Sequence, residues 1–200
     1  TRIGYLISLY AMGMVIGGPL STIALLKLRV PNKKGLLWLL GFYILAQSVA
    51  ASATSYDMLA VARVVTGVAA STCFGLSLAI CADIVNPNAR GRAAAVVIGG
   101  LMLASVVGVP VATLIDQHLG WRASFWLVVL LALLCLALIT VLVPRAKPSE
   151  IVSLGKELGE FRNRHLWAAY ASSGLIIGAI FAAFSYFAAI LTEITGFPAS

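Results

Sequence analysis

The chain has 200 residues, of which 61% are hydrophobic and 10% are charged. Soluble domains have about 45–50% apolar and about 25% charged residues, and a globule of this length cannot bury so large an apolar excess. The composition therefore excludes an ordinary water-soluble domain. The balance of 14 Lys and Arg against 7 Asp and Glu gives a net charge of +7. In a membrane chain this excess is typical of cytoplasmic loops rather than of a nucleic-acid surface.

Six apolar segments are long enough to cross a bilayer, because about 20 helical residues span its hydrocarbon core. In chain order they are residues 3–26, 36–53, 58–82, 93–115, 123–143 and 166–191. Each is rich in Leu, Ala, Ile and Val, and all but the third are free of charged residues. We therefore predict an all-α membrane protein with six transmembrane helices.

The connections between these segments alternate in charge. Eleven basic residues fall in the first, third and fifth connections, whereas only Arg2 and Arg122 lie on the other side. Because Lys and Arg concentrate in cytoplasmic loops, the first group is predicted to be cytoplasmic and the amino terminus of this chain to lie outside. The longest connection, residues 145–165, divides the chain into 1–144 with five spans and 166–200 with the sixth. A short surface helix and a polar linker fit residues 145–165 equally well.

Signatures of enzymes and of metal or nucleotide sites are absent from the sequence. The chain has no His-Glu-x-x-His, no Cys-x-x-Cys, no Gly-x-Ser-x-Gly and no phosphate-cradling Gly-x-x-x-x-Gly-Lys-Ser/Thr. Its two histidines, His118 and His165, stand singly at segment ends. We predict that the protein is not an enzyme and has no catalytic residue, no metal and no cofactor.

Arg63 is the one charged residue inside an apolar segment. A charge near the bilayer centre costs about 2.5–3.5 kcal/mol, so it needs a partner or water. The residues that share its helical face in the next two turns are small: Thr66, Gly67, Ala70 and Ser71. We expect Arg63 to point into the bundle; the alternative is that it reaches the outer headgroups, which Asp57 marks. No acid lies inside the six segments, so its partner is a carbonyl, a hydroxyl, a substrate or an acid elsewhere.

Glycine and proline cluster in the first and fourth segments. The clusters contain Gly13, Gly17, Gly18 and Pro19 in the first segment and Gly99, Gly108 and Pro110 in the fourth. Proline bends a helix and glycine lets helix backbones touch. Broken helices at corresponding places of inverted repeats point to a path through the membrane. The alternative is that both residue types are simply common in membrane helices.

Five stretches resemble motifs of the major facilitator superfamily, specifically of its drug:proton antiporter and arabinose-efflux-permease-like branch. They are residues 10–19, 29–34, 62–67, 99–110 and 119–126. The third resembles the Arg-x-x-x-Gly motif of the fourth helix, with Arg63 and Gly67. The fourth resembles the antiporter motif of the fifth helix, in a looser Gly-x-Pro form. Leu28 stands where the loop motif of the second stretch often has an acid.

The resemblance implies helices two to seven of a twelve-helix transporter. Since helical transporters commonly start inside, we expect one helix before this chain and five after it. The implied protein lies in the inner membrane, is a monomer, and exports small molecules in exchange for protons as its two halves rock. Two further possibilities stay open: a sugar exporter or facilitator without a proton step, and a truncated, non-transporting membrane protein.

The resemblance also implies residue roles. Arg63 would favour the ionised form of a nearby acid and so couple transport to protons. The glycines and prolines named above would permit the helices to bend and slide. The basic cluster would hold the cytoplasmic face by pairing with the other half or with anionic lipid. That cluster consists of Arg29, Lys33 and Lys34.

Overall fold

The computed structural model describes residues 2–28, 30–143 and 164–194, and the structural statements below concern these residues. The chain divides into two compact units, Thr1–Glu150 and Ile151–Ser200, and each is taken by itself. The surface helix considered for residues 145–165 lies outside the described residues, apart from Arg164 and His165 at the start of the last helix.

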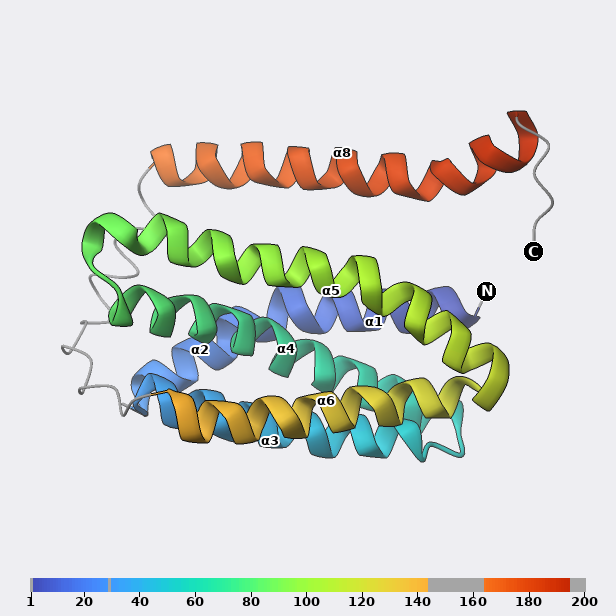
Figure 1. Cartoon of the computed structure of the whole chain (residues 1–200), viewed down its shortest axis with the longest axis horizontal. Helices are drawn as coiled ribbons and strands as arrows, with labels where there is room; N and C mark the ends of the chain where they lie inside the picture. The colour runs from blue at the N-terminus through green and yellow to red at the C-terminus, as the bar shows by residue number, and fades with distance from the viewer. Residues whose placement is uncertain (1, 29, 144–163, 195–200) are drawn as a thin grey trace. The chain divides into compact units, whose positions relative to one another are not determined.

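The first unit is a bundle of long helices, and the elements of both units are helical wherever the structure is described (Figure 1). In chain order they are α1 (Arg2–Met12), the π-helical η1 (Gly13–Gly17), α2 (Gly18–Lys27), α3 (Asn32–Ala51), α4 (Tyr56–Ile84), the short 3-10 helix η2 (Pro87–Ala89), α5 (Arg90–Leu119) and α6 (Trp121–Leu142). The second unit contributes α8 (Arg164–Ile194).

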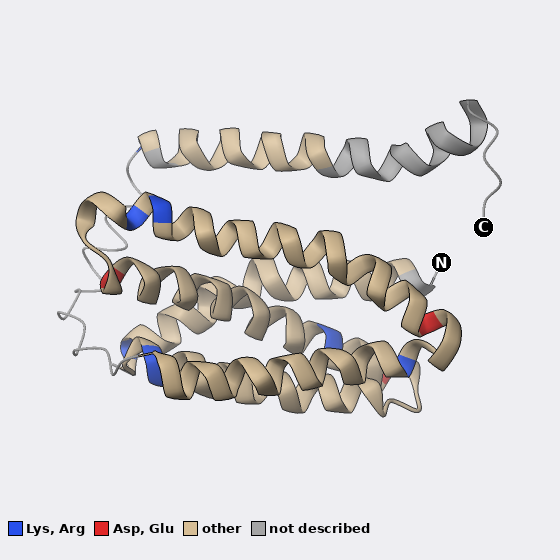
Figure 2. Cartoon of the chain, in the orientation of Figure 1, with Lys and Arg blue, Asp and Glu red and all other residues tan. Residues whose placement is uncertain are grey.

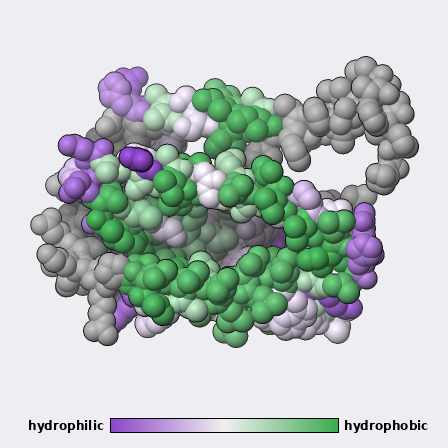
Figure 3. All heavy atoms as spheres, viewed as in Figure 1, coloured by the Kyte–Doolittle hydropathy of each residue, from purple (hydrophilic) through white to green (hydrophobic). Residues whose placement is uncertain are grey.

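The predicted all-α membrane fold is confirmed. Five stretches of helix are long and apolar enough to cross a membrane, namely Gly4–Lys27, Asn32–Ala51, Tyr56–Ile84, Pro87–Leu119 and Trp121–Leu142. The sixth predicted span coincides with α8, in which the described apolar stretch is Trp167–Ile180. On the face shown in Figure 3, apolar residues cover the sides of the helices. Large apolar side chains such as Leu130 and Val106 are exposed, as expected where lipid is the solvent.

The helices extend beyond the apolar segments from which they were predicted. The fourth segment was predicted as residues 93–115, whereas α5 runs from Arg90 to Leu119. Hydropathy reports only the part of a helix that matches the hydrocarbon, while backbone hydrogen bonding continues through polar residues such as Arg92 and Asp116.

The first span changes its helical pitch in the middle. Residues Gly13–Gly17 form a π-helical segment, and Pro19 follows it in the first turn of α2. A proline ring collides with the carbonyl group four residues earlier, here that of Val15. The wider π-helical turn accommodates this collision without ending the span.

Helix α4 is the centre of the first unit. It packs against α1, η1, α2, α3 and α5, and both α3 and α5 also pack against α6. Two small apolar clusters hold the α3 side together: Leu36 with Leu76 and Ile80, and Ile44 with Val129 and Ala132. None of the residues of α5 is buried in the described structure.

Candidate functional site

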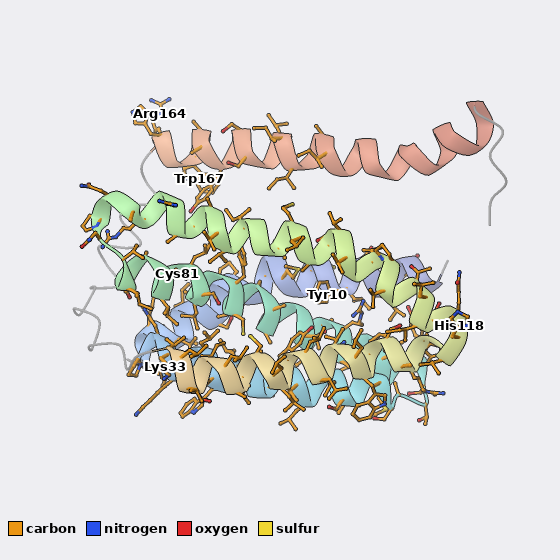
Figure 4. All side chains as sticks on the ribbon, in the orientation of Figure 1. Tyr10, Lys33, Cys81, His118, Arg164 and Trp167 are labelled. Carbon is orange, nitrogen blue, oxygen red and sulfur yellow. The ribbon has the colours of Figure 1, made fainter. Side chains whose placement is uncertain are left out.

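Arg63 lies inside the bundle, between three helices. Its side chain projects from α4, and its Cζ atom is 5.1 Å from the centroid of the Tyr10 ring on α1. The centroid of the Phe125 ring on α6 is 5.4 Å from the same atom. Both distances are within the about 6 Å at which a cation is attracted to an aromatic face. Tyr10 itself lies well away from the two ends of the bundle (Figure 4).

The two aromatic rings are the partners that the structure gives the guanidinium of Arg63. Within the described part of the chain, Arg63 donates no hydrogen bond and meets no carboxylate at ion-pair distance. The partners predicted for Arg63 were a carbonyl, a hydroxyl, a substrate or an acid elsewhere, and the rings of Tyr10 and Phe125 were not among them. Both belong to stretches that were singled out for other reasons, residues 10–19 and 119–126. The role of Arg63 and Gly67 in proton coupling stays a prediction.

Gly67 lies one turn after Arg63 and touches the same residue of α1. A Cβ atom at Gly67 would overlap the backbone oxygen of Tyr10 and lie 3.3 Å from the backbone nitrogen of Met14. Only glycine therefore permits α1 to come so close to α4 at this level. The Arg-x-x-x-Gly spacing places the guanidinium on the ring of Tyr10 and the glycine on its backbone.

The first span touches α4 at several successive turns, and the two partner residues at each turn are the same number of positions apart in the sequence. A Cβ atom at Gly13 would lie 2.5 Å from the backbone oxygen of Val64, and one at Gly17 would overlap the side chain of Val68. A full two turns beyond Gly13, the hydroxyl groups of Ser21 and Thr72 hydrogen-bond to each other. Because partner residues advance together along both chains, the two helices run parallel.

The glycine and proline residues of the two predicted clusters have different surroundings. Gly17 lies against Val68, and a Cβ atom at Gly18 would be 2.6 Å from the hydroxyl oxygen of Ser71. By contrast, a Cβ atom added at Gly99 or Gly108 would meet no other part of the described structure within 4 Å. Pro110 lies within α5, which continues through it as one helix. The structure therefore packs the glycines of the first cluster against α4, the helix that carries Arg63 and Gly67, whereas the glycines of the second cluster meet no other helix in the described residues.

Two further polar residues from α3 lie in the bundle interior, and the sequence analysis named neither. Tyr43 is half-buried and packs against the cluster of Ile44, Val129 and Ala132. Gln47, one helical turn further on, is 4% exposed, and its Oε1 atom has no hydrogen-bond partner in the described structure. An unsatisfied buried acceptor costs about 1–3 kcal/mol, so this oxygen destabilises the folded unit as described. The signal in the sequence is a glutamine inside an apolar span.

Lys33 binds the carboxyl end of another helix. Its Nζ atom donates hydrogen bonds to the backbone oxygens of Thr140, at 3.1 Å, and Val143. These carbonyls end α6, where a cation also complements the helix dipole. Lys34 is exposed, and Arg29 lies outside the described residues. Pairing of this cluster with another half or with lipid stays a prediction.

Arg122 makes the corresponding contact at the opposite end of the bundle. Its Nη2 atom donates a hydrogen bond of 2.9 Å to the backbone oxygen of Ala53, just beyond the end of α3. Lys33 and His118 mark the two opposite ends in Figure 4. Each of α3 and α6 thus begins with a cation that binds the carboxyl end of the other.

Among the described residues of the first unit, charge lies at the ends of the helices apart from a basic segment within α4 (Figure 2). At the end that carries Arg122, residues of α5 and α6 line an open, shallow pocket of about 300 Å³. The pocket is lined by Ala112, Thr113, Asp116, Trp121, Ser124 and Phe125. Phe125 therefore faces both this pocket and the guanidinium of Arg63.

These features define a multi-pass helical membrane protein with polar groups enclosed by its helices. The family model of the Major Facilitator Superfamily matches residues 1–200. The chain belongs to this superfamily of membrane transporters.

Three similar proteins illustrate the range of the family. An uncharacterized MFS-type transporter, YtbD of Bacillus subtilis, is 31% identical over the whole chain and 50% of its own length. A chloramphenicol resistance protein of Streptomyces lividans is 32% identical over 96% of the chain and 50% of its own length. A probable sugar efflux transporter of Mannheimia succiniciproducens is 30% identical over 85% of the chain and 43% of its own length. The chain spans about half the length of the curated relatives it matches.

Proposed function

We propose that the complete protein exports small molecules in exchange for protons, with Arg63 at the coupling site. The observation that carries the proposal is a guanidinium held inside the bundle with no carboxylate partner among the described residues. The family, and a relative named as a chloramphenicol resistance protein, support export as the direction and a drug as the cargo.

The arrangement suits coupling because the rings satisfy the charge of Arg63 without using its hydrogen-bond donors. A guanidinium has five N–H donors, and an aromatic face attracts the cation electrostatically. The donors are therefore free for a carboxylate from elsewhere in the complete protein or for the cargo. A nearby guanidinium favours the ionised form of a carboxylate, and so promotes release of its proton. A change of conformation that brings the carboxylate to Arg63 therefore releases its proton, and one that withdraws the carboxylate lets the proton bind again.

The test is transport by the complete protein in everted membrane vesicles, with radiolabelled chloramphenicol as the probe. We expect uptake that requires a proton gradient and collapses with an uncoupler. Arg63→Met keeps an unbranched aliphatic stem but removes the charged guanidinium, and we expect it to abolish uphill uptake. Arg92→Met, which alters an exposed cation at the end of the bundle, is the matched control and should transport normally. Normal proton-driven uptake by Arg63→Met would contradict the coupling role.

A second candidate is sugar export, which the relative named as a probable sugar efflux transporter favours. The polar groups of Tyr43 and Gln47 near the site could bind sugar hydroxyl groups. The same vesicles loaded with radiolabelled arabinose or lactose would distinguish the two. Sugar movement that is insensitive to the uncoupler would favour a facilitator without a proton step.

We also propose that the end of the bundle carrying Lys33, Lys34 and Arg92 faces the cytoplasm of an inner membrane, by the positive-inside rule. Single cysteines introduced at Lys34 and at His118, in a protein lacking its native cysteines, report the two ends. An impermeant thiol reagent added to intact cells should label the cysteine at position 118 and not the one at position 34. The reverse pattern would overturn the orientation.

A further inference from the structure

We propose that Tyr10 and Phe125 are positioning residues for Arg63, and that together they form an aromatic clamp on its guanidinium. This inference rests on the proposed coupling role of Arg63, and adds the groups that hold the arginine in place. Neither residue is charged, and neither is expected to exchange the coupled proton.

The two rings come from helices that meet Arg63 from different directions. Tyr10 lies on α1 and Phe125 on α6, and the guanidinium lies 5.1 Å and 5.4 Å from their centroids. The side chain of Arg63 thereby bridges α1, α4 and α6. A long, flexible arginine is restrained at its tip by contacts with two rings, while its N–H edges stay unpaired by the described residues. A preoriented donor set binds an incoming acceptor with less loss of side-chain entropy.

The close approach of α1 makes the clamp possible. Gly67 allows the backbone of Tyr10 to touch α4, and the Tyr10 ring then reaches back one turn to Arg63. A larger residue at Gly67 would push α1 outward and withdraw the ring. This explains in physical terms why arginine and glycine four positions apart act as a unit here.

The other ring connects the clamp to the pocket between α5 and α6. Phe125 lines that pocket together with Asp116, Thr113 and Ser124. A rearrangement of α5 against α6 would therefore move Phe125 and alter its contact with Arg63. The clamp gives the arginine a means to respond to changes at that end of the bundle.

The first experiment measures the clamp without any transported probe. Phenylalanine with one, two or three ring fluorines is incorporated at position 125 of the complete protein, because fluorine weakens the attraction of a ring for cations with little change in size. We expect the Tm in detergent to fall stepwise with each fluorine. In an Arg63→Met background the Tm should not change with the number of fluorines. Equal slopes with and without Arg63 would overturn the clamp.

The second experiment tests positioning with matched pairs and radiolabelled chloramphenicol. Tyr10→Phe and Phe125→Tyr keep a ring, whereas Tyr10→Leu and Phe125→Leu remove it. We expect the leucine variants to lose proton-driven uphill uptake by about tenfold while exchange of probe across the membrane without a gradient persists, and the ring-keeping variants to retain both. A purely structural role would lower uphill uptake and exchange together.

The outcomes separate this inference from the proposed function. If Arg63→Met loses uphill uptake and the leucine variants keep it, the clamp is wrong and the coupling role stands. If Arg63→Met keeps uphill uptake, the coupling role is wrong, and with it the positioning role of the two rings. If chloramphenicol is not carried at all, the fluorine series still decides whether the clamp exists.

Discussion

The contact between the first span and α4 differs from the surface of α5, although both contain glycine and proline. Along the first span, Gly13 and Gly17 lie so close to α4 that an added methyl group would overlap it. Along α5, Gly99 and Gly108 face open space in the described structure. A glycine and proline cluster therefore indicates that close approach is possible. It does not indicate that the partner is present in the same stretch of chain.

The difference extends to polar groups. The first contact contains the Arg63 guanidinium on α4 and a hydrogen bond between Ser21 and Thr72, whereas α5 has no buried residue in the described structure. Small residues bring backbones together, and polar side chains between them then lose water and need partners. Close packing and an enclosed polar site thus have one cause in this unit.

The largest expected effect comes from filling the closest contact. Gly67→Ala should destabilise the protein by about 1–3 kcal/mol, because its new Cβ atom would overlap rigid backbone of α1. Gly75→Ala on the same helix is the control, since an added Cβ atom at Gly75 would meet no other part of the described structure within 4 Å, and it should leave the Tm almost unchanged. Thermal unfolding in detergent measures both. Equal Tm values for the two variants would contradict the close contact between Gly67 and α1.

A smaller effect of opposite sign is expected at Gln47. Gln47→Leu removes a buried acceptor without a partner, so the free energy of unfolding should rise by about 1 kcal/mol. If the amide also binds cargo, the KM for transport should rise in the same variant while the Tm increases. A fall in Tm would mean that the amide is satisfied in the folded protein.

The hydrogen bond between the first span and α4 should contribute less. Ser21→Ala removes one of the two hydroxyl groups and should cost about 0.6 kcal/mol, the average for such bonds between membrane helices. Ser105→Ala on α5 is a fair control, because the Ser105 hydroxyl bonds only to the backbone of its own helix at Leu101. Thermal unfolding of the two variants side by side would show whether the first is the more costly.

The smallest effect is expected on α5. Gly108→Ala should leave the Tm of the complete protein almost unchanged, since nothing lies within 4 Å of Gly108. A fall as large as that of Gly67→Ala would show that residues outside the described structure pack against this face. In that case α5 would be as closely packed in the complete protein as the first span is against α4.

Hydropathy and charge were sufficient to predict the helical membrane fold. Five spans match predicted segments, because about 20 apolar residues can satisfy their backbone in lipid only as helix. The ends were predicted less well: α5 begins at Arg90 and ends at Leu119, where apolarity no longer marks the helix. The π-helical turn at Gly13–Gly17 has no separate signal beyond its glycines and the following proline.

The surroundings of Arg63 were predicted only in part, because contacts between helices depend on residues that are far apart in the sequence. The small residues after Arg63 predicted which face of α4 would meet another helix, and Gly67 does meet α1. The identity of the ring partners depended on how three helices pack, which periodicity within one segment does not report. Gln47 could have been noticed as a polar residue in an apolar span, but its lack of a partner is visible only in three dimensions.

The exchange of cations between α3 and α6 has a consequence for how this unit can move. Lys33 donates hydrogen bonds to the carboxyl end of α6, and Arg122 donates one to the backbone just after α3. The two antiparallel helices are therefore joined at both ends by similar contacts. Exchanging α3 and α6 about a twofold axis would place each cation where the other one lies, so these contacts have approximate twofold symmetry. Because sliding of α3 along α6 would break the hydrogen bonds at both ends, the pair resists such a shift.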